Sequence, residues 1–197
     1  MGFLDAFVGG AVISLVALYV KKRYQEVEYV QSSVDGHKYL VRRAEDSQEA
    51  ADTLARINAR VERLVAHLSG AHPGDDRTAL LRDRYDRSSL SEGGHNSGYT
   101  SFSVNKGEKI VMCIRSRDGS EENGEIERFN TLMYVILHEL AHVVTEEIGH
   151  TPAFWENFRW LLDEAETAGV YAKVDYSREP EEYCGININS SAAHKKK

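Results

Sequence analysis

The stretch HELAHVVTEEIGHTPAFW, residues 138–155, decides how this chain is organised and which chemistry it carries. His138 and His142 are four residues apart, so on a helix both imidazoles lie on one face, close enough to bind one metal ion. Glu139 follows the first histidine directly and points to the side, where its carboxylate can take a proton from a metal-bound water. This HExxH pattern is typical of a catalytic zinc site. The neighbouring residues are mostly apolar, which places the motif toward the interior of a domain.

A third ligand is expected from the residues that follow the motif. Gly149 can end the helix, and Thr151 followed by Pro152 is a favourable start for the next one. His150 lies at the turn between the two helices, and the reversal of the chain can bring its ring back to the metal. We therefore expect His150 to be the third ligand. The rival ligands are two carboxylates of the second helix, Asp163 and Glu164.

Outward from this stretch, the sequence predicts alternating hairpins and helices. Asp35-Gly36 favours a tight turn in a first hairpin, residues 28–43. Residues 46–49, DSQE, have the form of a capping box that opens a core-facing helix. The remaining predictions are a short helix at 76–87, a loop at 91–98, a hairpin of YTSFSV (99–104) with KIVMCIR (109–115), and a helix at 126–147.

The N-terminus differs in character from the rest of the chain. Residues 6–20 carry no charge and are followed by Lys21, Lys22 and Arg23. With the apolar residues before it, this run approaches the roughly 17–20 residues needed to cross a bilayer. The basic flank on one side predicts a single-pass anchor with the main domain in the cytosol. We divide the chain into an N-terminal membrane anchor (1–23), a metallopeptidase domain (24–190) and a basic tail (191–197).

Charge and cysteine content limit the possible partners and compartment. The formal net charge of −7 repels a phosphate backbone, and no local basic patch stands out, so strong nucleic-acid binding is not expected. The chain has two cysteines, Cys113 and Cys184, which could pair but are too few for a disulfide framework. We therefore expect both thiols to be reduced.

Several of these features together resemble the WLM family of metallopeptidases and its SprT-like relatives. The resemblance rests on HELAHV, the downstream histidine, the HxxxFW that it begins, and the strand KIVMCIR with Arg115 before the motif helix. Tyr183-Cys184-Gly185 adds a weaker similarity. The interval VVTEEIG before His150 is longer than is typical of WLM members. The resemblance covers residues 95–186 well and the preceding part only by arrangement.

The resemblance implies a zincin-like minimal metalloprotease of class α+β, with helices packed on a small antiparallel sheet. It implies that Zn²⁺ is bound by His138, His142 and His150 and that Glu139 is the general base. In such enzymes an extended peptide commonly lies along an edge strand, for which YTSFSV is our candidate, or KIVMCIR if the strand order is reversed. The candidates for stabilising the oxyanion are Tyr176, Tyr183 and His95.

The leading functional hypothesis is a membrane-tethered, zinc-dependent metallopeptidase that hydrolyses protein or peptide substrates by attack of a zinc-bound water. Family relatives act on proteins crosslinked to DNA, but the negative charge of this chain disfavours that role. An alternative is a non-catalytic, membrane-anchored zinc-binding scaffold or interaction domain. Glu139 argues against it, because a structural zinc site needs no base beside its ligands. Hydrolysis of a non-peptide amide is a third hypothesis.

Overall fold

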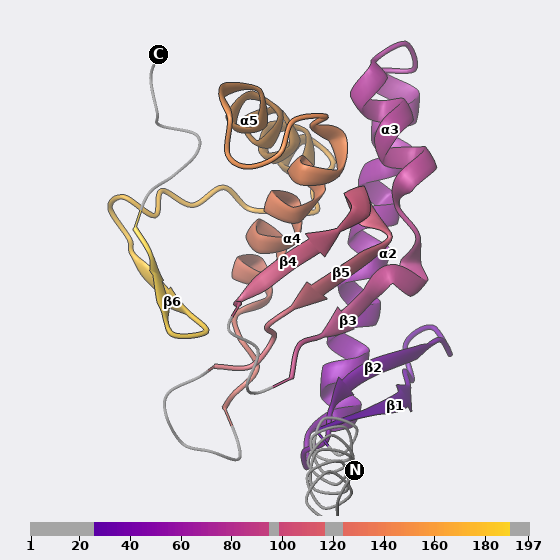
Figure 1. Cartoon of the computed structure of the whole chain (residues 1–197), viewed down its shortest axis with the longest axis vertical. Helices are drawn as coiled ribbons and strands as arrows, with labels where there is room; N and C mark the ends of the chain where they lie inside the picture. The colour runs from indigo at the N-terminus through magenta and orange to yellow at the C-terminus, as the bar shows by residue number, and fades with distance from the viewer. Residues whose placement is uncertain (1–25, 95–98, 117–123, 190–197) are drawn as a thin grey trace, which may run out of the picture.

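The computed structural model describes residues 26–94, 99–116 and 124–189. These residues form an α+β fold in which helices pack against a small central sheet (Figure 1). Along the chain the elements are β1 (Val27–Gln31), β2 (Lys38–Arg42), α2 (Ser47–Ala71), α3 (Asp76–Arg84), η1 (Arg87–Ser89), β3 (Leu90–Glu92), β4 (Ser101–Val104), η2 (Asn105–Gly107), β5 (Lys109–Met112), α4 (Phe129–Val144), α5 (Pro152–Thr167), β6 (Glu181–Tyr183) and β7 (Ile186–Ile188).

The central sheet has the strand order β3-β5-β4. The predicted hairpin of β4 and β5 is confirmed, and β4 lies at the edge, as expected for YTSFSV. The expectation of an antiparallel sheet was wrong, because β3 runs parallel to β5. β5 therefore lies between the other two strands, parallel to β3 and antiparallel to β4. Ser91 and Glu92, which we assigned to a loop, belong to β3. This strand was missed because its three residues, two of them polar, are too few to show the alternation of apolar and polar side chains that indicates a strand.

The first hairpin and the helix after it agree with the sequence prediction, except at the helix start. β1 and β2 pair antiparallel, and α2 turns an apolar stripe into the core. The capping box was wrong, because the side chain of Asp46 makes no capping hydrogen bond. Its carboxylate instead pairs with the guanidinium group of Arg115 at 3.0 Å. The stripe consists of fully buried Leu54, Ile57, Val61, Leu64 and Leu68.

The helix that carries the HExxH motif is shorter than predicted at both ends. α4 begins at Phe129 because Ile126, the predicted start, forms an isolated β-bridge with Arg115. It ends at Val144, so the residues after it form an exposed loop that leads into α5. α4 packs against both α5 and β4, which places the motif between a helix and the edge of the sheet (Figure 1).

The prediction of a single-pass membrane protein is corrected. Among the residues described, 26–94, 99–116 and 124–189, no helix combines the length and the apolar character needed to cross a bilayer. The stretch that we interpreted as an anchor, residues 1–23, lies outside these ranges, as does the basic tail at 191–197. The fold class is therefore α+β without an assigned transmembrane helix.

The two cysteines are joined, contrary to the expectation of reduced thiols. Cys113 follows β5 and forms a disulfide with Cys184, at a sequence separation of 71 residues. Cys184 lies in the turn of the β6–β7 hairpin, so the bond attaches this hairpin to the end of the central sheet. The hydroxyl of Tyr183 reinforces the attachment by donating to the carbonyl oxygen of Cys113 at 2.6 Å. Sequence alone did not reveal the pair, because the two residues approach only through the tertiary fold.

Removal of this disulfide is expected to destabilise the fold. Because the bond closes a long loop, its loss gives the unfolded chain more conformational freedom, and typical costs are about 2–4 kcal/mol. We expect the free energy of unfolding in urea to fall by that amount in the Cys113→Ala/Cys184→Ala double variant. Wild-type protein with its disulfide reduced should unfold at a urea concentration similar to that of the double variant. Equal stability of oxidised and reduced wild-type protein would contradict the prediction.

Candidate metal centre

Three histidines converge at the junction of α4 and α5. The ring centroids of His138 and His142, on successive turns of α4, are 5.1 Å apart. His150, in the turn after α4, lies 4.9 Å from the first ring and 5.0 Å from the second. The Nε2 atoms of His138 and His150 are 3.1 Å apart, and one potential ligand atom from each residue lies within 4.8 Å of the others. The three rings therefore surround one point.

The local sequence explains why the chain turns back after α4 and brings His150 to His138 and His142. Gly149 has φ +87°, a left-handed conformation that glycine adopts without steric cost, and it allows the reversal. Thr151 then caps α5 by accepting a hydrogen bond from the amide of Phe154 at 3.3 Å, and Pro152 occupies the first turn. The predicted start of the second helix is thus confirmed.

Phe154 lies against all three imidazoles. Its ring centroid is 4.9 Å from that of His138, 4.3 Å from that of His142 and 4.7 Å from that of His150. Phe154 itself is fully buried. This aromatic contact restricts the orientations of the rings and shields one side of the cluster from water, which favours a defined arrangement of nitrogen atoms.

The electrostatics of the cluster favour neutral imidazoles. Burial, together with the nearby rings of His142 and His150, lowers the pKa of His138 to about 3. Burial, His150 and the ammonium group of Lys106 lower the pKa of His142 to about 4. Two neutral rings at physiological pH leave nitrogen lone pairs available, as metal binding requires. The donor set and its geometry fit a divalent cation, so the cluster could hold a metal ion.

Glu139 lies beside the cluster and outside it. Its side chain is buried, with 4% of the residue exposed, and it accepts a hydrogen bond from the hydroxyl of Ser103 on β4. Burial raises its pKa to about 7, although the Ser103 hydrogen bond acts in the opposite direction. A carboxylate with this pKa exchanges protons readily near neutral pH, which suits a general base.

Strand β4 presents an open edge above this glutamate. Thr100 and Cys113 are partners in a hydrogen-bonded pair, since the carbonyl oxygen of Thr100 accepts from the amide of Cys113 at 2.7 Å. Because such pairs alternate along antiparallel strands, the main-chain groups of Ser101 and Ser103 point away from β5. Within the described part of the chain no further strand pairs with this edge. The hydroxyl of Ser103 therefore donates to Glu139, while its main-chain groups point away from β5.

The rival carboxylate ligands are engaged elsewhere. One oxygen of Glu164 lies 2.8 Å from Nε2 of His67 on α2, and the other lies 2.8 Å from Nε2 of His72, the residue directly after that helix. Asp163 pairs with Lys173 at 3.0 Å. The structure therefore brings His150, and neither of these carboxylates, to the two motif histidines.

The two candidates for oxyanion stabilisation that lie in the described part of the chain, Tyr176 and Tyr183, make their contacts away from the cluster. Tyr183 is buried and its hydroxyl bonds with the main chain of Cys113 and the hydroxyl of Ser101. Tyr176 is fully buried, with its ring edge-on to Tyr134 at a centroid distance of 4.8 Å, as a packing residue of the core. His95 lies outside the described residues.

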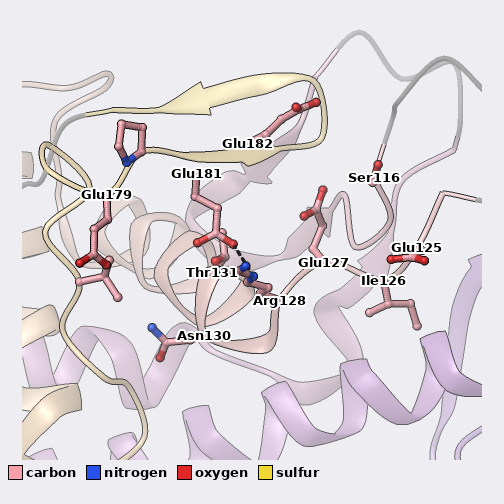
Figure 2. A pocket seen from close by; sticks show the side chains of 12 residues that line it. Ser116, Glu125, Ile126, Glu127, Arg128, Asn130, Thr131, Glu179, Glu181 and Glu182 are labelled. Atoms are coloured by element: carbon pink, nitrogen blue, oxygen red, sulfur yellow. Dashed lines mark ion pairs between the residues drawn. The ribbon is translucent and has the colours of Figure 1, made fainter.

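A cavity of about 770 Å³ lies at the other end of α4 (Figure 2). Asn130 and Thr131, from the first turn of the helix, line it, whereas His138 and His142 lie in the last two turns and His150 follows the helix. Arg128 and Glu181 form an ion pair of 3.6 Å at its wall. The cavity contains none of the three histidines, so it is separate from the candidate metal centre. Its acidic lining disfavours anionic ligands and consists of Glu125, Glu127, Glu179, Glu181 and Glu182.

Two residues near the centre were missed from sequence. Ser103 is one of the alternating serines of YTSFSV, and that alternation indicates which residues share a face of the strand. It could not indicate that this face meets Glu139. Lys106 was treated as part of a turn, and no local pattern distinguishes it from other exposed lysines.

Comparison with known proteins identifies relatives without a described activity. The model of the WLM domain family matches residues 85–196. An uncharacterized protein of Acanthamoeba polyphaga mimivirus is 33% identical over 183 residues, covering 91% of each chain. One of Invertebrate iridescent virus 6 is 36% identical over 94 residues, covering 48% of this chain and 51% of the relative. One of Invertebrate iridescent virus 3 is 46% identical over 72 residues, covering 36% and 42%. No solved structure matches the chain.

Proposed function

The chain belongs to the WLM domain family, and from that premise we propose that it is a zinc-dependent metallopeptidase. The observation that carries the proposal is the placement of Glu139, buried beside three convergent histidines while remaining outside the set of ligands. A site that served only to bind a metal would have no use for a carboxylate with a pKa of about 7 next to it.

In this proposal His138, His142 and His150 bind the metal through ring nitrogens. Three histidines leave one position of a tetrahedral zinc site free, as in catalytic centres of this type. When bound, zinc would act as a Lewis acid, polarising the scissile carbonyl and lowering the pKa of water. Imidazole nitrogens suit zinc but also copper, iron and nickel. Peptide hydrolysis transfers no electrons, so we propose zinc, which has no redox chemistry.

Glu139 would supply the proton transfer. Its carboxylate accepts the proton of the attacking water and delivers it to the nitrogen of the leaving amine. The hydrogen bond from Ser103 on β4 restricts the orientation of the carboxylate of Glu139 on α4. Because that bond favours the ionised form, it also keeps part of the population competent to act as a base.

We propose that the substrate is a peptide in extended conformation along the open edge of β4. The outward main-chain groups of Ser101 and Ser103 would form the hydrogen bonds of an added strand. This places a peptide bond within reach of Glu139, because Ser103 contacts that residue directly. Main-chain recognition requires an unfolded or flexible substrate segment and gives little selectivity by itself.

The test is hydrolysis of an unfolded protein by the full chain, stripped of metal and then reconstituted with zinc. We expect about one equivalent of zinc by elemental analysis and fragments that appear only after reconstitution. The His138→Ala variant is expected to lose both zinc and hydrolysis. The Glu164→Gln variant is the matched control. The carboxylate of Glu164 binds His67 and His72 and does not contact the histidine cluster.

The outcomes separate the competing functions. Zinc binding with no hydrolysis of any unfolded substrate would favour the non-catalytic zinc-binding domain. A wild-type protein that binds no zinc would rule out the peptidase. Hydrolysis that persists after metal removal would show that the histidine cluster is not the catalytic centre.

A further inference from the structure

The loop that carries His150 is not held in place by burial. Thr145 is buried, but the five residues after it, 146–150, are all exposed. Ile148, two residues before the histidine, is 93% exposed. An exposed loop of this kind samples many conformations unless polar contacts restrict it. The position of His150 against the other two rings therefore requires an additional restraint.

Lys106, in the turn between β4 and β5, provides such a restraint. Its ammonium group donates to the main-chain carbonyl oxygens of Thr145 and Glu147, the latter at 3.0 Å. These carbonyls directly follow the C-terminus of α4, where unpaired carbonyl groups and the helix dipole favour a cation. Glu147 is only three residues before His150, so the contact restricts the loop close to the third ring.

The backbone of the turn is shaped to deliver this side chain. Asn105 and Lys106 have φ values of 46° and 57°, in the left-handed region that a lysine rarely adopts. Gly107 has φ 107°, and a Cβ atom there would lie 3.1 Å from the carbonyl oxygen of Arg84 and 3.2 Å from a methyl group of Val143. The turn therefore packs tightly against the end of α4. A disfavoured conformation that tertiary packing maintains is a mark of functional constraint.

A second cation holds the beginning of the same loop. Arg84, from α3, donates to the carbonyl oxygen of Val143 at 2.8 Å and pairs with Glu146 at 2.8 Å. Its contacts end at residue 146, whereas those of Lys106 extend to residue 147. Of these two cations, Lys106 therefore acts closer to His150.

We propose that Lys106 is a positioning residue for the third metal ligand. By binding the carbonyls of Thr145 and Glu147, its side chain holds the 145–150 loop so that His150 meets the other two histidines. This inference rests on the proposed function, because it assigns the three rings to one metal ion. Since Lys106 lies two residues after the end of β4, it also links the proposed peptide-binding strand to the metal centre.

The sign of the effect distinguishes positioning from simple electrostatics. A positive charge near His142 repels a divalent cation, so loss of the Lys106 charge alone would strengthen metal binding. Loss of the restraint on the loop would weaken binding, because His150 would then have to be ordered each time the metal binds. Weaker metal binding in a variant without the ammonium group is therefore specific to positioning.

The experiment measures zinc affinity of the full chain by competition with a chromogenic chelator. In Lys106→Met, which keeps an unbranched side chain one atom shorter and removes the donors, we expect affinity to fall about 10–100-fold, as for other residues that orient metal ligands. Lys106→Arg, which retains a cationic donor, is expected to restore most of the affinity. Lys109→Met removes an exposed lysine a few residues along the chain, at the start of β5, and is expected to leave affinity unchanged.

A double-variant cycle tests whether the effect passes through His150. In the His150→Ala background, where two histidines remain, Lys106→Met is expected to cause no further loss of zinc affinity. In metal-free protein, Lys106→Met should also increase amide hydrogen exchange in residues 146–150. Unchanged zinc affinity in Lys106→Met, or an equal loss in the His150→Ala background, would overturn the inference while leaving the peptidase proposal intact. Absence of zinc binding by the wild type would overturn both.

Discussion

Replacement of Glu139 by glutamine is expected to eliminate most peptide hydrolysis while leaving zinc bound. The amide has nearly the shape of the carboxylate but cannot accept the proton of the attacking water, and general-base contributions amount to about 10²–10⁴-fold. Because Glu139 lies outside the histidine cluster, its replacement removes no ligand. The measurements are initial rates on an unfolded protein substrate and zinc content, both made on the same preparation.

A matched control excludes a general effect of lost negative charge. Glu156 is exposed on α5, close to the cluster in sequence, and the Glu156→Gln variant should hydrolyse substrate at the wild-type rate. If Glu139→Gln also kept the wild-type rate, Glu139 would not be the base. If Glu139→Gln lost its zinc, the carboxylate would contribute to the metal site, and the assignment of three histidine ligands would need revision.

The features that were predicted correctly from sequence are local ones. The helical spacing of His138 and His142, the reversal at Gly149 and the cap at Thr151 are all decided within thirteen or fourteen residues. Short-range geometry was therefore sufficient to predict that the chain turns back and brings His150 towards the motif, although it did not predict the contacts of Lys106 with the loop. The hairpins of β1 with β2 and β4 with β5 are local for the same reason.

The features that were missed depend on residues far apart in the chain. The strand β3 is too short to show a pattern, and its parallel pairing with β5 depends on how the chain crosses the sheet. The disulfide joins Cys113 to a hairpin 71 residues later. Glu164 was a reasonable ligand by spacing, but the histidines that bind it, His67 and His72, come from the end of α2. No sequence window contains both partners of such contacts.

The buried ion pair of Arg115 and Glu92 is a further long-range contact, and loss of the arginine is expected to be strongly destabilising. Arg115 is 1% exposed and Glu92 is 3% exposed. Nη1 of the arginine donates to both carboxylate oxygens of Glu92, at 2.7 and 2.9 Å, and its Nε donates to Asp46 at 3.0 Å. The Arg115→Met variant leaves the carboxylate of Glu92 buried without its partner, which typically costs about 3–5 kcal/mol.

The companion variant and the pH dependence identify the cause of that loss. Burial already raises the pKa of Glu92 above its usual value of 4.5, despite the nearby Arg115, and removal of the arginine would raise it further. The native state then binds more protons at Glu92 than the unfolded state does between pH 4.5 and the folded pKa, so the contribution of Glu92 to stability is greatest below pH 4.5 and is lost as pH rises through that folded pKa. In urea denaturation, Arg115→Met should therefore lose more stability at pH 8 than at pH 5. The Arg115→Met/Glu92→Met double variant should recover much of the loss, because no unpaired charge remains buried. A loss that is independent of pH and undiminished in the double variant would instead indicate that packing of the arginine side chain, and not its charge, stabilises this junction.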